Sequence, residues 1–228
     1  YNNGAADRDW PILTTYVDGG GSTRTYHLTG ANNNNEIWAE DIAYNAGDEA
    51  AYVIWNDVSD YSFGVVAKLD PNNLSSYTWV RRLGDGSNGN TYLTSIDTDE
   101  NGDIYILGDL SAVSGGDFIL IKMSAAGDVL WQRQIGSNQY EGSGSDALEP
   151  PGWNSSSSIS VKDGYVTITG FSTAFNQNQP NVMTVNYPSD GSITGEFGGY
   201  HFNEFDVGVV PDWSDTIVEL TGGTNLNN

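Results

Sequence analysis

The acidic segment between residues 97 and 103 has the residue types and the spacing of a calcium-binding loop. Side-chain oxygens stand at four alternate positions, supplied by Asp97, Asp99, Asn101 and Asp103. Oxygens spaced in this way can converge on one hard cation, with Gly102 making the sharp turn, so calcium is the cofactor that the pattern predicts. Against this, Gly108 stands where an EF-hand has its bidentate Glu, and Asn-Gly between strands is also an ordinary hairpin turn. The sequence leaves both interpretations open.

The other polar residues match no established catalytic or zinc-binding pattern. The chain has two histidines, His27 and His201, no cysteine and no paired-histidine spacing, which argues against a zinc site. No G-x-S-x-G elbow supports a hydrolase triad. The 30 acidic residues offer many carboxylate pairs for glycoside hydrolysis, yet no pair stands out by its spacing. We therefore expect no catalytic residue.

Three aromatic residues in irregular segments are candidates for ligand binding. Tyr140 and Trp153 lie in Gln139–Ser158, which interrupts the repeat described below, and Trp213 lies in the turn Pro211–Asp215. Long loops on a rigid scaffold often carry binding residues, and an aromatic ring in such a loop can stack on a sugar or contact a neighbouring subunit. A surface insertion that the fold tolerates explains the longer segment equally well.

A repeated unit of short strands must position these residues. Segments Tyr77–Gly84 and Val129–Gly136 read YTWVRRLG and VLWQRQIG, and their tryptophans, Trp79 and Trp131, lie 52 positions apart. Each unit has four short runs rich in Val, Ile, Tyr and Trp, separated by turn residues, and such runs indicate strands joined by hairpins. A Trp that recurs at one phase of a strand indicates packing between units rather than a sugar platform.

Basic residues recur with the same unit. Lys68 corresponds to Lys122 on the third run, and Arg81 corresponds to Arg133 on the fourth. We expect the two arginines to pair with acidic residues between units or at the rim, in preference to binding a ligand.

The repeats predict an all-β fold, a β-propeller of about four four-stranded blades in a single domain, residues 1–228. The expected blades lie at about residues 37–84, 93–136 and 157–198, and, in two parts, 206–222 with 10–30. In the degenerate third blade, Ser192–Gly198 is the expected fourth strand. The last blade is predicted to combine C-terminal and N-terminal strands, because radial closure shortens and protects the edges of sheets.

Charge and composition exclude some partners. The net charge is −22, which repels the phosphates of nucleic acids and anionic membranes, and no run of about 18 apolar residues predicts membrane insertion. Adaptation to salty water and binding of divalent cations both explain the acidity. The chain begins at Tyr1, which indicates a processed product or a piece of something longer. The absence of cysteine favours a prokaryotic or viral protein.

The segment Tyr105–Ser137 resembles the SBBP repeats, a family named after seven-bladed β-propellers. Its D-x-F-L-x-K-L strand is matched by Asp117–Gly127 and its W-x-R-x-L-G strand by Val129–Gly136. Very similar W-x-R-x-L-G repeats are typical of structural proteins of marine bacterial viruses, so the resemblance implies a tail-fibre, appendage or other virion protein. The seven blades of the family's name do not fit, because only four units are found.

These observations favour a non-enzymatic structural or adhesive module on a virion surface or tail appendage. Such a module would present loops to a host glycan, a receptor or other subunits, with a homo-oligomer expected and a virion or extracellular location. One alternative is a secreted glycan-active enzyme, a hydrolase or lyase with carboxylates at the propeller mouth. Another is a bacterial cell-surface or extracellular filament module.

Overall fold

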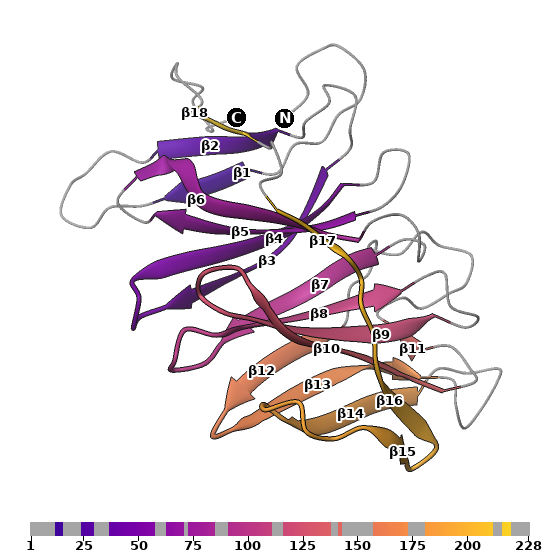
Figure 1. Ribbon diagram of the computed structural model, residues 1–228. Helices are drawn as coiled ribbons and strands as arrows, with labels where there is room; N and C mark the ends of the chain where they lie inside the picture. Colours follow the sequence, from indigo (N-terminus) through magenta and orange to yellow (C-terminus); the bar gives the residue numbers. More distant parts are fainter. Residues whose placement is uncertain are drawn as a thin grey trace.

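Four antiparallel sheets stacked in a row make up the protein, as seen in a computed structural model (Figure 1). The structure describes residues 12–15, 24–29, 37–57, 63–70, 73–84, 91–110, 116–137, 141–142, 157–172, 181–211 and 216–219. Strands account for all the regular elements in this part of the chain. The predicted all-β class is therefore confirmed.

The first sheet contains the first repeat as four strands in chain order. These are β3 (Ile37–Asn45), β4 (Ala50–Asp57), β5 (Phe63–Asp70) and β6 (Asn73–Leu83). Each strand pairs antiparallel with the next. β-Branched and aromatic residues fill the strands, and Asp and Gly mark the turn between β3 and β4, as expected for hairpins.

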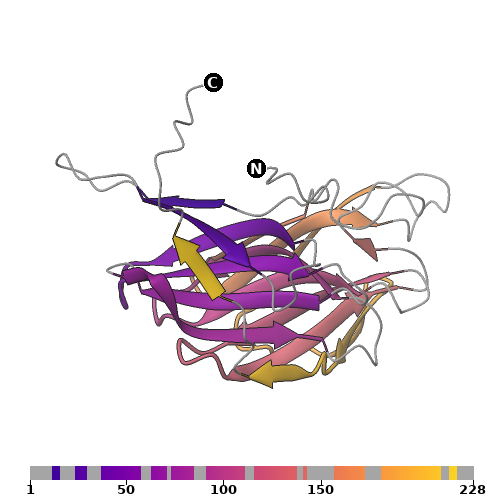
Figure 2. The same cartoon turned by 90° about the horizontal axis from the view of Figure 1, so that it is seen from above.

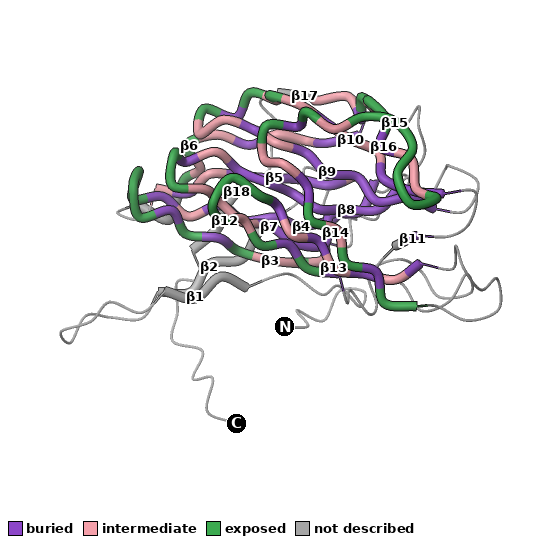
Figure 3. The backbone as a smooth tube through the Cα atoms, turned by 90° about the horizontal axis from the view of Figure 1, so that it is seen from below, coloured by how far each residue is buried: buried purple, intermediate pink, exposed green. Residues whose placement is uncertain are grey.

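The second sheet repeats this arrangement. It is formed by β7 (Thr91–Thr98), β8 (Ile104–Leu110), β9 (Asp117–Met123) and β10 (Val129–Gly136). All of β8 and nearly all of β9 are buried (Figure 3), because another sheet covers each face. The two clear repeats thus form two sheets of the same design.

The third sheet departs from the prediction at its fourth strand. Strands β12 (Ser158–Lys162), β13 (Tyr165–Ser172) and β14 (Asn181–Pro188) pair in chain order, and the short β11 (Glu141–Gly142) pairs with the end of β13. Ser192–Gly198 was expected to follow β14 as the fourth strand. Its strand β15 (Gly195–Phe197) instead pairs with β16 (Tyr200–Glu204), which pairs with β10 of the second sheet. Phe202 is buried there against the core between the second and third sheets, which favours this position.

The terminal sheet unites the two ends of the chain, but in a different order from the one predicted. Its strands are β1 (Ile12–Thr15), β2 (Arg24–Thr29) and β18 (Thr216–Glu219), in the order β1-β2-β18. The expected split blade would place Val207–Val210 in this sheet. Instead, β17 (Val209–Pro211) pairs with β6 of the first sheet. The sharing of one sheet by β2 and β18 agrees with the prediction, whereas the strand order and the place of β17 do not.

Strands β15 to β18 form what we call the C-terminal strap. It runs from the third sheet back toward the terminal sheet, pairing with the outer strand of the second sheet, then the first, then with β2 (Figures 1 and 2). Val207 is buried in the core on the way, and the Gly84 N–H donates to the Gly208 carbonyl at 2.9 Å. The strap thus covers exposed sheet edges. The described strands form this row, and they do not show the closed four-bladed ring that we expected.

Candidate functional site

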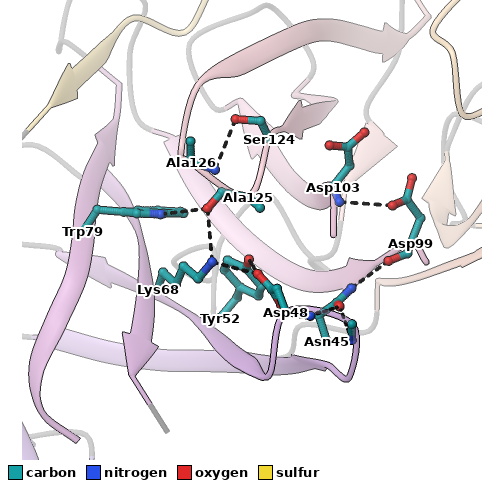
Figure 4. Close-up of polar contacts among 11 residues, drawn as sticks. Asn45, Asp48, Tyr52, Lys68, Trp79, Asp99, Asp103, Ser124, Ala125 and Ala126 are labelled. Carbon is teal, nitrogen blue, oxygen red and sulfur yellow. Dashed lines mark hydrogen bonds and ion pairs between the residues drawn. The ribbon is translucent and has the colours of Figure 1, made fainter. Parts of the chain in front are cut away.

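Side chains of the first sheet form a set of hydrogen bonds with a turn of the second sheet. The Trp79 indole N–H donates to the Ala125 carbonyl at 3.1 Å, and the Lys68 ammonium group approaches the same oxygen at 3.4 Å (Figure 4). Arg81 Nε donates to the Gly127 carbonyl at 3.2 Å. We call this set of a Lys, a Trp and an Arg around the β9–β10 turn the clasp.

The turn glycine completes the clasp by its lack of a side chain. Gly127 has a φ of +84°, and a Cβ there would lie 3.0 Å from the ring of Trp79. The guanidinium carbon of Arg81 stands 5.3 Å from the centre of the same ring, in a cation–π arrangement. The indole is therefore enclosed between the turn and the arginine.

An equivalent Arg and Trp of the second sheet contact a turn of the third sheet. Arg133 donates from Nη2 to the Gly191 carbonyl at 2.6 Å, and its guanidinium carbon stands 5.6 Å from the ring centre of Trp131. A Cβ at Gly191 would lie 2.9 Å from the Trp131 ring. Tyr105 adds a further contact between these two sheets, since its hydroxyl donates to the Ser189 carbonyl at 3.3 Å. The prediction that both tryptophans pack between repeats is thus confirmed.

We predicted that Arg81 and Arg133 make structural contacts with acidic partners, and the contacts described above are structural and are made to backbone carbonyls of the neighbouring turn. Carboxylates pair instead with the lysines of the repeat, since Lys68 contacts Asp48 at 2.7 Å and Lys122 contacts Asp103 at 2.8 Å.

These ion pairs shift the pKa values of their members. Burial raises the pKa of the Asp48 carboxyl, but hydrogen bonds from Lys68 and Tyr52 outweigh burial, so the pKa lies below its usual value. For Lys122, burial lowers the pKa and the hydrogen bond with Asp103 more than restores it, so the pKa lies above its usual value. Both groups therefore remain charged at neutral pH and hold the repeat together.

The four predicted calcium ligands do not converge on one point. Asp99 Oδ1 accepts hydrogen bonds from the backbone N–H groups of Asn101 and Asp103, as in an ordinary hairpin turn. Asp103 is paired with Lys122, as described above. Asp97 reaches the third sheet, where its Oδ2 accepts from the Val161 N–H at 2.7 Å. In the described part of the chain, no group of three or more His, Asp or Glu residues is arranged to hold a metal ion, so the structure lends calcium no support.

A polar cleft of about 340 Å³ adjoins these residues. It lies between the β7–β8 turn of the second sheet and the β12–β13 turn of the third. Its walls are formed by Thr98, Asp99, Glu100, Asn101, Val161, Lys162, Asp163, Gly164 and Ser189. Three acidic residues and one lysine are among these walls, so the cleft offers polar groups to a small polar molecule.

Two of the four buried carboxylates in the described residues have no solvent exposure, and sequence reasoning did not single them out. Glu141 is fully buried, and its carboxylate accepts hydrogen bonds from the N–H and hydroxyl of Ser137, both at 2.7 Å, and from the hydroxyl of Ser172 at 2.9 Å. Asp117 is also fully buried, and it accepts from Gln134 and contacts His201 Nε2 at 3.3 Å. Asp117 lies in the repeated third-strand motif, which could have drawn attention to it, whereas Glu141 carries no such signal.

The two acids join strands rather than face solvent. Burial raises the pKa of Glu141, and the nearby charge of Asp117 raises it further. Because neither side chain is exposed, neither can reach a polymeric substrate in this conformation. Their contacts connect β9, β10, β11, β13 and β16, which makes the cluster a support between the second and third sheets. Tyr140, Trp153 and Trp213, the predicted ligand-binding aromatics, lie outside the described residues.

Two residues of the clasp, Trp79 and Arg81, lie within a segment that matches a known repeat. Residues 78–109 match the model of the SBBP family, a beta-propeller repeat. The match runs from the clasp strand β6 to β8, so it spans the connection between the first two sheets. It supports the resemblance to this family. No curated protein matches the chain, and none of the described residues form a helix long and apolar enough to cross a membrane.

Proposed function

We propose that the chain is a non-enzymatic structural or adhesive module of a surface assembly, such as a virion appendage. In this proposal the sheets act as propeller-type blades, stiffly stacked, and their connecting loops contact a glycan, a receptor or neighbouring subunits. A rigid scaffold that presents loops is a common basis for binding.

One observation carries the proposal: the residues that recur with the repeat are used between sheets. The first clasp holds its Lys, Trp and Arg against the next sheet, the second holds its Trp and Arg there, and in both the turn glycine is fitted to the Trp. An enzyme needs titratable groups within reach of a substrate. The carboxylates of Asp117 and Glu141 are instead enclosed in the core.

The proposal is tested by cryo-electron microscopy of the native particle or fibre that carries the chain. We expect the map to contain copies of the stack at regular positions. Recovery of the chain only as an isolated soluble monomer would contradict it. A parallel assay incubates the purified chain with a panel of polysaccharides and analyses released sugars by mass spectrometry. Products that vanish when one exposed carboxylate is changed to its amide would favour the glycan-active enzyme instead.

A further inference from the structure

The outer strand of the third sheet, β14, lacks the partner that the repeat provides elsewhere. In the first and second sheets, the third strands β5 and β9 each pair with a fourth strand, β6 and β10. In the third sheet, β14 pairs with β13, and no described residue pairs with its other edge. The chain leaves β14 and adds its next strands to the second sheet. From Val182 to Pro188, this edge therefore has no paired strand within the described structure.

The strap strands at the other outer edges are short and carry residues that discourage pairing, and residues 73–80 of β6, which β17 leaves uncovered, pair with β5 through two register shifts. The strap strand β15 has three residues and contains Glu196, β17 has three and contains Pro211, and β18 has four and contains Glu219. Short strands, charges and prolines at sheet edges are the usual protection against pairing with another chain.

The inner edges are protected as well. Strand β3 has a bulge and carries Glu40 and Asp41, and β7 has a bulge and carries Asp97. The five-residue β12 ends with Lys162. Bulges and charges again reduce the tendency of an edge to add a strand.

By contrast, β14 has no such protection. Its eight residues, NVMTVNYP, include no charged side chain, and their register with β13 runs without a bulge. Its only proline is the last residue, Pro188. Val182 is 75 % exposed, and Thr184 and Asn186 are exposed on the same face, whereas Met183 and Tyr187 anchor the opposite face in the core. A long, flat, uncharged edge of this kind is a template for strand addition.

We propose that β14 is a dimerisation strand, which pairs antiparallel with the β14 of a second copy of this chain. Antiparallel pairing matches the β5–β6 and β9–β10 pairs that occupy the equivalent edge. A two-fold axis makes two identical edges complementary, and such isologous contacts are the commonest in oligomers. Residues directly opposite in an antiparallel pair point to the same face, so the two-fold axis lies between a residue and its own copy, and nearly full overlap places it at Thr184 or at Val185. The inference rests on the edge itself and is independent of the proposed surface function.

Charge favours this strand over the rest of the surface for contact between copies. The chain carries a net charge of −22, so most orientations of two copies repel. The uncharged β14 lets the backbones approach with the least local repulsion. Because the remaining repulsion is between exposed charges, added salt screens it and strengthens the dimer.

Sedimentation velocity of the full chain over a range of concentrations tests the proposal. We expect a species of twice the 24.6 kDa monomer mass that increases with concentration and with added salt. The double variant Thr184→Lys with Asn186→Lys places four like charges at the dimer centre, and we expect it to weaken dimerisation at least tenfold. The matched control is Ser160→Lys, an exposed position on β12 of the same sheet, and it is expected to dimerise like the natural chain.

Single cysteines provide a second, positional readout, because the chain has no cysteine of its own. Under mild oxidation we expect Val182→Cys, Thr184→Cys and Asn186→Cys to form disulfide dimers, fastest nearest the axis, and Ser160→Cys to remain monomeric. A natural chain that stays monomeric up to about 1 mM at high salt overturns the proposal. Dimers that the Lys pair does not weaken, or that cross-link as well through residue 160, also overturn it. If β14 pairs only with a different protein and not with a second copy of this chain, the proposal is also overturned.

Discussion

A methyl group added to the turn glycine of the first clasp should destabilise the protein more than the same change in a turn that touches nothing. Gly127→Ala places a Cβ 3.0 Å from the Trp79 ring, at a φ of +84° that L-residues disfavour. Gly164 has a nearly equal φ of +80°, but a Cβ there has nothing within 4 Å. The pair therefore separates the backbone cost from the packing cost.

The magnitude follows from these geometries. The left-handed conformation costs about 1–2 kcal/mol for a residue with a Cβ, and both variants incur this cost. Only Gly127→Ala also displaces Trp79, whose hydrogen bond to Ala125 contributes about 1 kcal/mol, with further loss from disturbed packing. We expect Gly127→Ala to lower the free energy of unfolding by about 2–3 kcal/mol, and Gly164→Ala by about 1–2 kcal/mol, which is about 1 kcal/mol less.

Urea unfolding followed by Trp fluorescence and far-ultraviolet circular dichroism measures both variants. Thermal unfolding should show the same order, with the midpoint of Gly127→Ala lower by about 2–4 °C for each kcal/mol in a chain of this size. If the two variants lose equal stability, the turn glycine is required for its backbone conformation alone. The interpretation of the clasp as a packed contact between sheets would then be wrong.

Three further results are expected. Trp79→Phe should lose about 1 kcal/mol more than Trp131→Phe in urea unfolding, because Trp79 donates to Ala125 whereas the Trp131 indole N–H has no hydrogen-bond partner in the described structure; equal losses would contradict this. Since burial raises the pKa of Glu141 above its usual 4.5, the folded state binds a proton more tightly than the unfolded state. Stability should thus rise as the pH falls from 7 through the folded-state pKa, and Glu141→Gln should remove that rise; an unchanged pH profile would refute the assignment. Calcium added at millimolar concentration should leave the unfolding midpoint of the natural chain and of Asp99→Asn equally unaffected, and a rise in the natural chain alone would restore the calcium loop.

Strand positions were predictable because their signals are local. Short apolar runs separated by Gly and Asn fix hairpins within about 50 residues, and the segments around Trp79 and Trp131 fall on equivalent strands, β6 and β10. That these tryptophans are packed also followed from their recurrence. What they pack against did not, because the partner turns at Gly127 and Gly191 belong to the next sheet.

The candidate calcium loop shows the limit of a residue pattern taken alone. The spacing of Asp97, Asp99 and Asp103 fits a cation loop, but strand alternation turns the three carboxylates in different directions. Asp97 reaches Val161, Asp99 closes its own turn, and Asp103 meets Lys122. Each partner comes from the stacking of sheets or from the repeat's own lysine, so the residue types alone could not reveal it.

By itself, the sequence determined the all-β class, the two clear repeats and the residues that recur within them, because hairpin formation depends on neighbouring residues. Only the tertiary structure decided the course of the C-terminal strap, the enclosure of Glu141 and the open edge of β14. Ser192–Gly198 reads equally well as a fourth strand of the third sheet or as part of an edge of the second. Phe202, on the strand that follows, is buried between the second and third sheets, and this burial favours the second arrangement.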